Sequence, residues 1–250
     1  MLLVKNLTKI YDGRVLALDN VNFEVPDGQF LAIIGLSGSG KSTLLRCINR
    51  LVEPTDGEII WNGVNITQAS PEEMRRIRRK IGMVFQNFNL VNRSNVITNV
   101  LAGRLGYINP AWSLLNHFHK EDLEKARLQL TRVGIPEKAN NRADELSGGQ
   151  QQRVGIARAL MQDPEIILAD EPVASLDPVL AHSIMKYLEQ INKEDGVMVL
   201  CSLHFLDIVH RYANRVVALN EGRVVFEGLP AEIDDLKFKE IYGRDAERVG

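Results

Sequence analysis

The chain has 250 residues, of which 45% are hydrophobic and 25% are charged, and its formal net charge is −2. These values are typical of a globular protein with one sizeable core, or of one domain with an inserted lobe. The near-neutral charge argues against a strongly basic nucleic-acid-binding protein, and no run of about 18 apolar residues is present that could span a membrane.

The first 34 residues have the pattern of β-strands separated by turns. Residues 1–10 alternate as a strand does and lack the long apolar core of a signal peptide. Asp12-Gly13 and the Pro-Asp-Gly sequence at residues 26–28 are typical of turns. Residues 29–34 form a short apolar run, which predicts a buried strand.

A glycine-rich segment follows this strand directly. Residues 35–42 read G-x-x-x-x-G-K-S, the pattern of the phosphate-binding loop of nucleoside triphosphatases. Glycines allow a tight turn that brings backbone N–H groups close to phosphate oxygens. The Lys41 ammonium would neutralise the β- and γ-phosphates, and the Ser42 hydroxyl would ligate Mg²⁺. The predicted nucleotide-binding residues here are Gly35, Leu36, Ser37, Gly38, Ser39, Gly40, Lys41, Ser42 and Thr43.

A helix is predicted to begin at the end of this loop. Leu44, Ile48 and Leu51 recur at helical spacing, with Leu45 and Val52 beside them. The positive end of the helix dipole would then face the same anion. Strand, loop and helix therefore occur in the order that nucleotide binding requires.

The next segments predict a hairpin and a capped helix. Residues 57–66 suggest a strand pair with Asn62-Gly63 at its turn. Ser70 would cap a helix that has Pro at its first position and Glu73 three residues after the cap. This helix could carry a phosphate or nucleic-acid patch, but we interpret it as a solvated face, because the rest of the chain is not basic. Its basic residues are Arg75, Arg76, Arg78, Arg79 and Lys80.

A second glycine-containing helix start lies further along the chain. Residues 81–85 predict an apolar strand that ends at Gln86, and residues 87–160 are predicted to be mostly helical. Within them, Leu-Ser-Gly-Gly-Gln at residues 146–150 precedes an apolar helix face. Ser147 is a good N-cap, and Gly148 and Gly149 permit close backbone approach to a ligand. We interpret this start as a second anion-binding site, although an ordinary capped helix has the same short pattern.

Two carboxylates follow the apolar strand predicted at residues 166–169. A parallel sheet would deliver Asp170 to its C-terminal edge, where Asp170 would hold Mg²⁺ directly or through water. Glu171 would point elsewhere and serve as the general base that positions the attacking water. Taken alone, this pair could also be an exposed acidic turn before Pro172.

The last part of the chain alternates between helix and strand. Residues 179–193 predict a helix and residues 197–200 a buried strand, so a parallel sheet is expected. From about residue 213 we expect a short hairpin with its turn at residues 220–222, then a polar helix. The two cysteines, Cys47 and Cys201, lie far apart, which favours a reducing cytoplasm over a disulfide framework.

The motifs, in this order, resemble those of the ATP-binding cassette (ABC) ATPases over essentially the whole chain. Residues 146–150 match the family's signature motif. The resemblance implies a P-loop α/β fold with a mostly parallel core sheet and an antiparallel β lobe, at residues 1–86 and 161–250. It also implies an inserted helical subdomain at about residues 87–160, and ATP and Mg²⁺ as cofactors.

Further positions match the family one by one. Tyr11 is similar to the aromatic residue that stacks on adenine, with strand packing as the alternative. Gln86 resembles the glutamine that senses Mg²⁺ and the attacking water, and would join Ser42 and Asp170 at the metal. His204 resembles the switch histidine at the γ-phosphate. The loop that crosses the family's dimer interface is matched by Ser175, Leu176 and Asp177. The histidines that match nothing, which we interpret as surface or packing residues, are His117, His119, His182 and His210.

The family's mechanism implies a homodimer or a pair of related cassettes. Each ATP would lie between the phosphate loop of one subunit and the signature residues of the other, so that hydrolysis opens the clamp. The implied partners are transmembrane permease subunits and, indirectly, an extracytoplasmic solute-binding protein, with no nucleic acid. The expected location is the cytoplasmic face of the plasma membrane. The signature contacts would be Ser147, Gly148, Gly149 and Gln150.

Within the family, a short single cassette is similar to a bacterial importer subunit. A chromosome or repair ATPase would need a long coiled coil, and a translation-type protein two cassettes. The segments at residues 89–93, 99–106 and 107–119, the Val173-Ala174 pair and the separation of His204 from Asp207 resemble phosphonate-import ATPases, a group that includes phosphite importers. Loop drift is the alternative, as is import of another small solute such as an amino acid. The helical lobe would dock on the permease through exposed arginines and aromatics such as Trp112 and Phe118.

Overall fold

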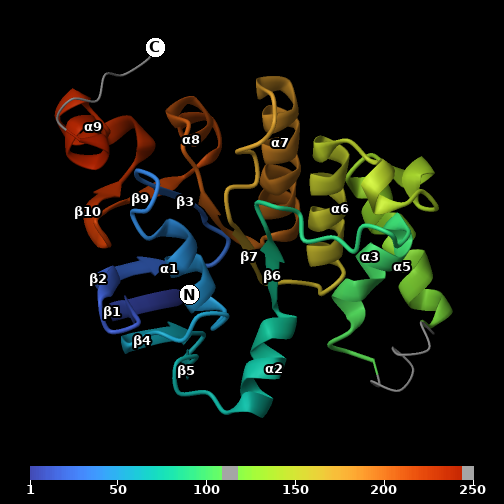
Figure 1. Ribbon diagram of the computed structural model, residues 1–250, viewed down its shortest axis with the longest axis horizontal. Helices are drawn as coiled ribbons and strands as arrows, with labels where there is room; N and C mark the ends of the chain where they lie inside the picture. Colours follow the sequence, from blue (N-terminus) through green and yellow to red (C-terminus); the bar gives the residue numbers. More distant parts are fainter. Residues whose placement is uncertain (109–117, 244–250) are drawn as a thin grey trace.

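A six-stranded sheet forms the centre of the computed structural model, which describes residues 1–108 and 118–243 (Figure 1). The strand order is β10-β9-β3-β8-β7-β6, and every neighbouring pair is parallel except β9 with β10. The mostly parallel core sheet is therefore confirmed. Its strands are β3 (Phe30–Ile34), β6 (Ile81–Val84), β7 (Ile166–Ala169), β8 (Met198–Ser202), β9 (Arg215–Asn220) and β10 (Arg223–Gly228).

A separate antiparallel sheet forms the β lobe, in the order β2-β1-β4-β5. The hairpin predicted at Asn62-Gly63 is confirmed. Both residues have positive φ, 49° and 80°, as a tight two-residue turn between twisted strands requires. The strands of this sheet are β1 (Leu2–Tyr11), β2 (Val15–Val25), β4 (Asp56–Trp61) and β5 (Val64–Asn65).

Helices cover the two faces of the central sheet. The α-helices are α1 (Lys41–Ile48), α2 (Pro71–Arg79), α3 (Val96–Leu101), α5 (Lys120–Arg132), α6 (Gly148–Leu160), α7 (Pro178–Asp195), α8 (Leu206–Tyr212) and α9 (Asp235–Tyr242). The 3₁₀ turns are η1 (Ala102–Arg104), η2 (Pro136–Lys138), η3 (Ala143–Glu145) and η4 (Pro230–Glu232). Among the described helices, none has the length and hydropathy needed to cross a bilayer.

Alternation along β3 divides the core in two. Phe30, Ala32 and Ile34 belong to one apolar cluster, and Leu31 and Ile33 belong to the other. The first cluster holds residues of α3, α5, α6, α7, α8 and α9, and the second holds residues of α1, α2 and the β lobe. The central sheet therefore separates two apolar cores.

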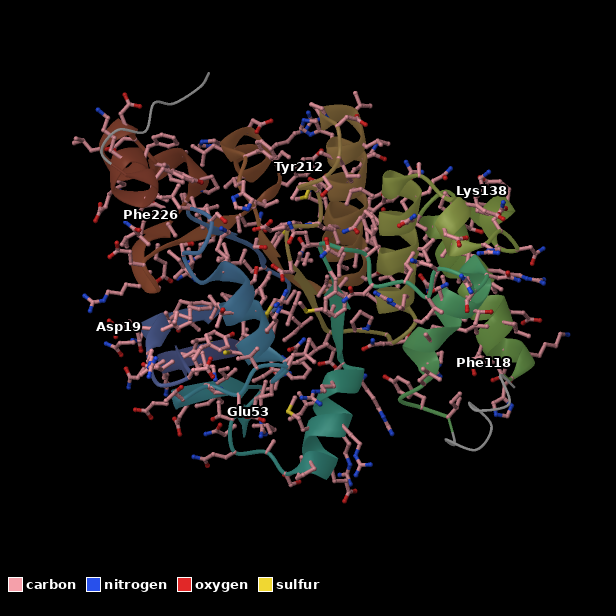
Figure 2. All side chains as sticks on the ribbon, in the orientation of Figure 1. Asp19, Glu53, Phe118, Lys138, Tyr212 and Phe226 are labelled. Carbon is pink, nitrogen blue, oxygen red and sulfur yellow. The ribbon has the colours of Figure 1, made fainter. Side chains whose placement is uncertain are left out.

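Helices α3, α5 and α6 contact one another at the β6 side of the sheet, inside the range expected for the helical subdomain (Figure 1). Helix α6 also contacts β6, so this lobe and the sheet share one apolar cluster. Phe118, which precedes α5, is half-buried against that cluster rather than fully exposed (Figure 2). Trp112 and His117 lie outside the described residues.

One predicted helix boundary is wrong. Helix α1 ends at Ile48, and Leu51, which we expected on its buried face, is 53% exposed. Arg50 has a left-handed φ of 51°, and the Leu51 N–H donates to the Asn49 side chain at 3.1 Å. Asn49 and Arg50 thus turn the chain away from the helix axis, as residues at a helix C-terminus commonly do.

Candidate nucleotide-binding and catalytic site

The parallel strands bring most of the predicted site residues to one edge of the sheet. Gly35 follows β3, Gln86 lies two residues after β6, Asp170 follows β7, and His204 lies two residues after β8. A cavity of about 300 Å³ lies at this edge. Because parallel strands end on the same side, this is where α/β sheets bind ligands. The cavity is lined by Ala17, Ser37, Gly38, Gly40, Lys41, Ser42, Thr43, Gln86 and Glu171.

The phosphate loop requires glycine where other backbone comes close. Gly40 is the N-cap of α1 with a φ of 105°, and a Cβ there would lie 2.5 Å from the Ala17 carbonyl oxygen. A Cβ on Gly35 would lie 2.1 Å from the Leu219 carbonyl oxygen. No side chain caps this helix start, so its first N–H groups remain available to an anion.

Lys41 is held inside this loop. Its side chain is 3% exposed, and Nζ donates to the carbonyl oxygens of Gly35 and Leu36, both at 2.9 Å. Burial lowers the pKa of Lys41, while the nearby carboxylates of Glu171 and Asp170 raise it in part. A buried ammonium with two carbonyl partners is well placed to exchange them for the charged oxygens of a phosphate.

Asp170 is 1% exposed and joins the phosphate loop to the sheet. Its Oδ1 accepts from Ser42 Oγ at 2.6 Å and from Ser202 Oγ at 3.3 Å, and its Oδ2 accepts from Arg46 at 3.1 Å. In the described ranges, no group of three or more His, Cys, Asp or Glu residues could hold a metal alone. Mg²⁺ in nucleotide sites takes one or two carboxylates with phosphate oxygens and waters, so the hydroxyl and carboxylate present here fit that ion.

Glu171 has a left-handed backbone, with a φ of 48°. Such a conformation is costly for a residue other than glycine and is often found at functional sites. The Glu171 N–H donates to Ser202 Oγ at 2.7 Å, and its Oε1 lies 2.6 Å from His204 Nε2. The carboxylate side chain is 15% exposed and lines the cavity. This arrangement would suit the predicted general base, with a histidine to orient its carboxylate.

Tyr11 lies beside the loop on the β-lobe side. Its hydroxyl is 3.4 Å from Thr43 Oγ1, and Lys9 Nζ stands 4.9 Å from its ring centroid. Tyr11 is only half-buried. Stacking of Tyr11 on adenine stays a prediction.

The signature residues do not line this cavity. Ser147 caps α6 by accepting from Gln150 N–H at 3.4 Å, and Gln150 Oε1 accepts from Ser147 N–H at 3.1 Å. A Cβ on Gly148 would lie 3.7 Å from both Leu176 and Phe88. The signature start therefore lies beside the predicted interface loop, whose Asp177 caps α7 through two bonds of 3.0 Å.

Sequence reasoning missed three residues of this site. Arg46 pairs with Asp170, and its spacing of four residues from Ser42, one helical turn along the same face, could have indicated it. Ser202 is a hydroxyl at the end of an apolar strand, a weak signal in one sequence. Ala17 contributes to the cavity from the β lobe, and nothing in its residue type suggests this.

Among the remaining histidines, His182 of α7 has a packing role. Its Nδ1 lies 3.2 Å from the hydroxyl of Tyr212 in α8, and Figure 2 marks Tyr212. His119 is the N-cap of α5, without a side-chain capping bond. His210 lies in α8 and is not among the cavity-lining residues.

The fold and the site together define a phosphate-loop nucleoside triphosphatase. The family model for ABC transporters matches residues 18–174. The chain belongs to the ABC transporter family, as one of its ATP-binding, ATP-hydrolysing cassettes.

Curated relatives match nearly the whole chain. It is 53% identical over 250 residues to the "Phosphonates import ATP-binding protein PhnC" of Bdellovibrio bacteriovorus, covering 100% of this chain and 96% of the relative. It is 51% identical over 244 residues to "Phosphonates import ATP-binding protein PhnC 3" of Halalkalibacterium halodurans, covering 98% and 95%.

A solved cassette dimer in a post-hydrolysis state, bound to ADP and phosphate, superposes with a TM-score of 0.82 at 37% identity, covering 92% of this chain and 99% of that one. A cassette solved in its ADP conformation gives a TM-score of 0.83 at 31% identity, covering 96% of each. These matches confirm the predicted cassette fold.

Proposed function

We propose that this chain hydrolyses ATP to drive phosphonate or phosphite import through a separate membrane permease in a bacterium. The observation that carries the choice of cargo is the identity of 51–53% to proteins named for phosphonate import, over nearly all of both chains. The two solved cassettes above, which are not named for phosphonate import, also cover 92–96% of the chain, but at only 31–37% identity.

The roles proposed for the residues follow from their positions. The Lys41 ammonium and the N–H groups at the start of α1 would bind the phosphates. The ligands proposed for Mg²⁺, which would neutralise charge on the phosphates, are Ser42, Asp170 and Gln86. Glu171 would take a proton from the water that attacks the γ-phosphorus, and the bond to the β–γ bridging oxygen would break. His204, which is hydrogen-bonded to Glu171, would hold that carboxylate in place and would also approach the γ-phosphate.

A dimer would complete the site. Within the described residues, the cavity lining comes from the phosphate loop, Ala17, Gln86 and Glu171, and it includes none of the signature or interface-loop residues. Ser147, Gly148, Gly149 and Gln150 of a second copy, with its interface loop at Ser175, Leu176 and Asp177, would complete that lining. A solved relative of the family is a cassette dimer.

The import partners follow from the family's architecture. Permease subunits would contact the helical lobe at α3, α5 and α6, and would hold the cassette at the cytoplasmic face of the membrane. A solute-binding protein outside the cell would deliver the cargo.

Growth of the source organism tests the cargo. A strain lacking the gene should fail to grow with a phosphonate or phosphite as sole phosphorus source and should grow on phosphate. The wild-type gene should restore growth, and Glu171→Gln should not. Normal growth of the deletion strain on all three sources, with no second importer present, would refute the cargo assignment.

A further inference from the structure

Ser202 is a buried hydroxyl at the end of an apolar strand. It is the last residue of β8, and its side chain is 0% exposed. The register of β8 with β7 pairs Cys201 with Ala169, so Ser202 lies beside Asp170. A hydroxyl in such an apolar environment is costly unless it is hydrogen-bonded.

Its bonds join the two carboxylate residues of the site. Ser202 Oγ accepts from the Glu171 N–H at 2.7 Å, and it lies 3.3 Å from Asp170 Oδ1 and 3.5 Å from the Ala169 carbonyl oxygen. A serine hydroxyl has a single proton to donate. The closer and charged Asp170 oxygen is the stronger acceptor.

The backbone at Glu171 explains why this contact matters. The Asp170 N–H still donates to the Val84 carbonyl oxygen of β6, at 2.9 Å. One residue later the chain enters the left-handed conformation, and the Glu171 N–H points instead to the strand on the other side of β7. Ser202 therefore holds the residue at which the strand turns, and the Glu171 side chain reaches His204 from that turn.

We propose that Ser202 is a positioning residue for ATP hydrolysis. Its single hydroxyl fixes Glu171 relative to Asp170, and so fixes the base relative to the metal ligand. The inference rests on the roles proposed above for these two carboxylates. Ser202 is not among the cavity-lining residues, so its loss should lower kcat and leave the KM for ATP nearly unchanged.

A pair of variants of equal shape tests this. Ser202→Thr keeps a hydroxyl and Ser202→Val replaces it with a methyl group. Loss of the hydroxyl leaves a buried N–H unsatisfied, so Ser202→Val should reduce kcat about tenfold, with a KM for ATP within about twofold of the wild type. Ser202→Thr should retain most of the kcat. Both are measured by steady-state ATP hydrolysis of the full chain, with thermal denaturation to verify folding.

Two controls separate positioning from packing. Ser202→Ala removes the hydroxyl without crowding, and should reproduce the loss of kcat even if the larger side chains unfold the protein. Cys201→Ala perturbs the neighbouring buried position of β8, whose thiol contacts the Ser202 backbone carbonyl at 3.9 Å and not the Ser202 hydroxyl, and should keep the wild-type kcat once folded.

The possible results distinguish the inference from the function it rests on. Equal kcat values in the Thr and Val variants, or a full kcat in Ser202→Ala, would overturn the role of Ser202 alone if Glu171→Gln still abolishes turnover. Normal turnover by Glu171→Gln would overturn the inference together with the role of Glu171. A raised KM for ATP at constant kcat would also overturn it, since that result describes a binding residue.

Discussion

Two helices of this molecule, α1 and α6, begin at glycine-rich segments, but only α6 has side chains that cap its first N–H groups. Helix α1 has Gly40 as its N-cap, without a side-chain capping bond, and opens onto the cavity. Helix α6 has Ser147 as its N-cap. The side chains of Ser147 and Gln150 accept from each other's N–H groups, and α6 lies outside the cavity lining.

This difference shows that a glycine-rich helix start does not by itself form a complete anion-binding site. Helix α1 has its first donors available within one chain, next to a buried Lys41. At α6 the cap occupies the N–H groups of Ser147 and Gln150, at 3.1 and 3.4 Å. A nucleotide contact at α6 would require a partner subunit, because α6 does not line the cavity of its own chain, whereas α1 does.

The largest expected effect tests both helix starts together. Glu171→Gln should reduce kcat by roughly 10³-fold or more, because it removes the proposed general base while leaving the phosphate contacts of α1. ATP should then persist and trap a dimer, seen by light scattering with ATP but not with ADP. Combining it with Ser147→Arg should abolish that dimer; a dimer that survives would mean that α6 does not contact the nucleotide.

Lys41→Ala should act on α1 alone. Losing a charged donor to the phosphates should weaken ATP binding by about 100-fold, measured by titration with a fluorescent ATP analogue. Ser147→Ala provides the matched control, since the monomer should bind the analogue as the wild type does. Unchanged affinity in Lys41→Ala would refute our interpretation of the loop.

Two glycine substitutions compare the backbones of the helix starts. Gly40→Ala should destabilise the chain by about 2–4 kcal/mol, because its φ of 105° is strained for alanine and its Cβ would meet the Ala17 carbonyl at 2.5 Å. Gly148→Ala has only ordinary contacts at 3.7 Å, so its stability should change by less than about 0.5 kcal/mol. Urea denaturation measures both, and equal losses would contradict the described geometry.

The smallest effect concerns the cap itself. Ser147→Ala should lower the free energy of unfolding by about 1 kcal/mol, the usual value of an N-cap. Ser147→Asp should keep most of that stability, since aspartate also caps, but it would place a negative charge where a second phosphate is expected. If both variants unfold like the wild type, the cap does not stabilise α6.

The sequence predicted most clearly those features that depend on neighbouring residues. The capping box of α2 forms as expected, with Ser70 and Glu73 exchanging bonds of 2.8 and 3.3 Å. Buried strands were recognisable as apolar runs, and their alternation with helices implied parallel pairing. Helix α8, which begins two residues after His204, was not predicted.

What the sequence could not provide depends on strand order. The contact of Ser202 with Glu171 exists because β8 lies beside β7, between it and β3, and no local pattern specifies that neighbour. The end of α1 was missed because Arg50 adopts a left-handed backbone, for which arginine has no particular preference. The roles of the predicted site residues remain predictions, although many of them lie around one cavity.

The core shared by α6 and the sheet has a consequence for building chimeras. Val154 and Ala157 of α6 lie in the same buried cluster as Val84 of β6, the strand that α6 contacts. A lobe exchanged between two cassettes at residues 87 and 160 would carry its own α6 onto a foreign β6 surface. Such a graft would need the matching β6 residues as well, so the lobe cannot be transplanted as a free-standing module.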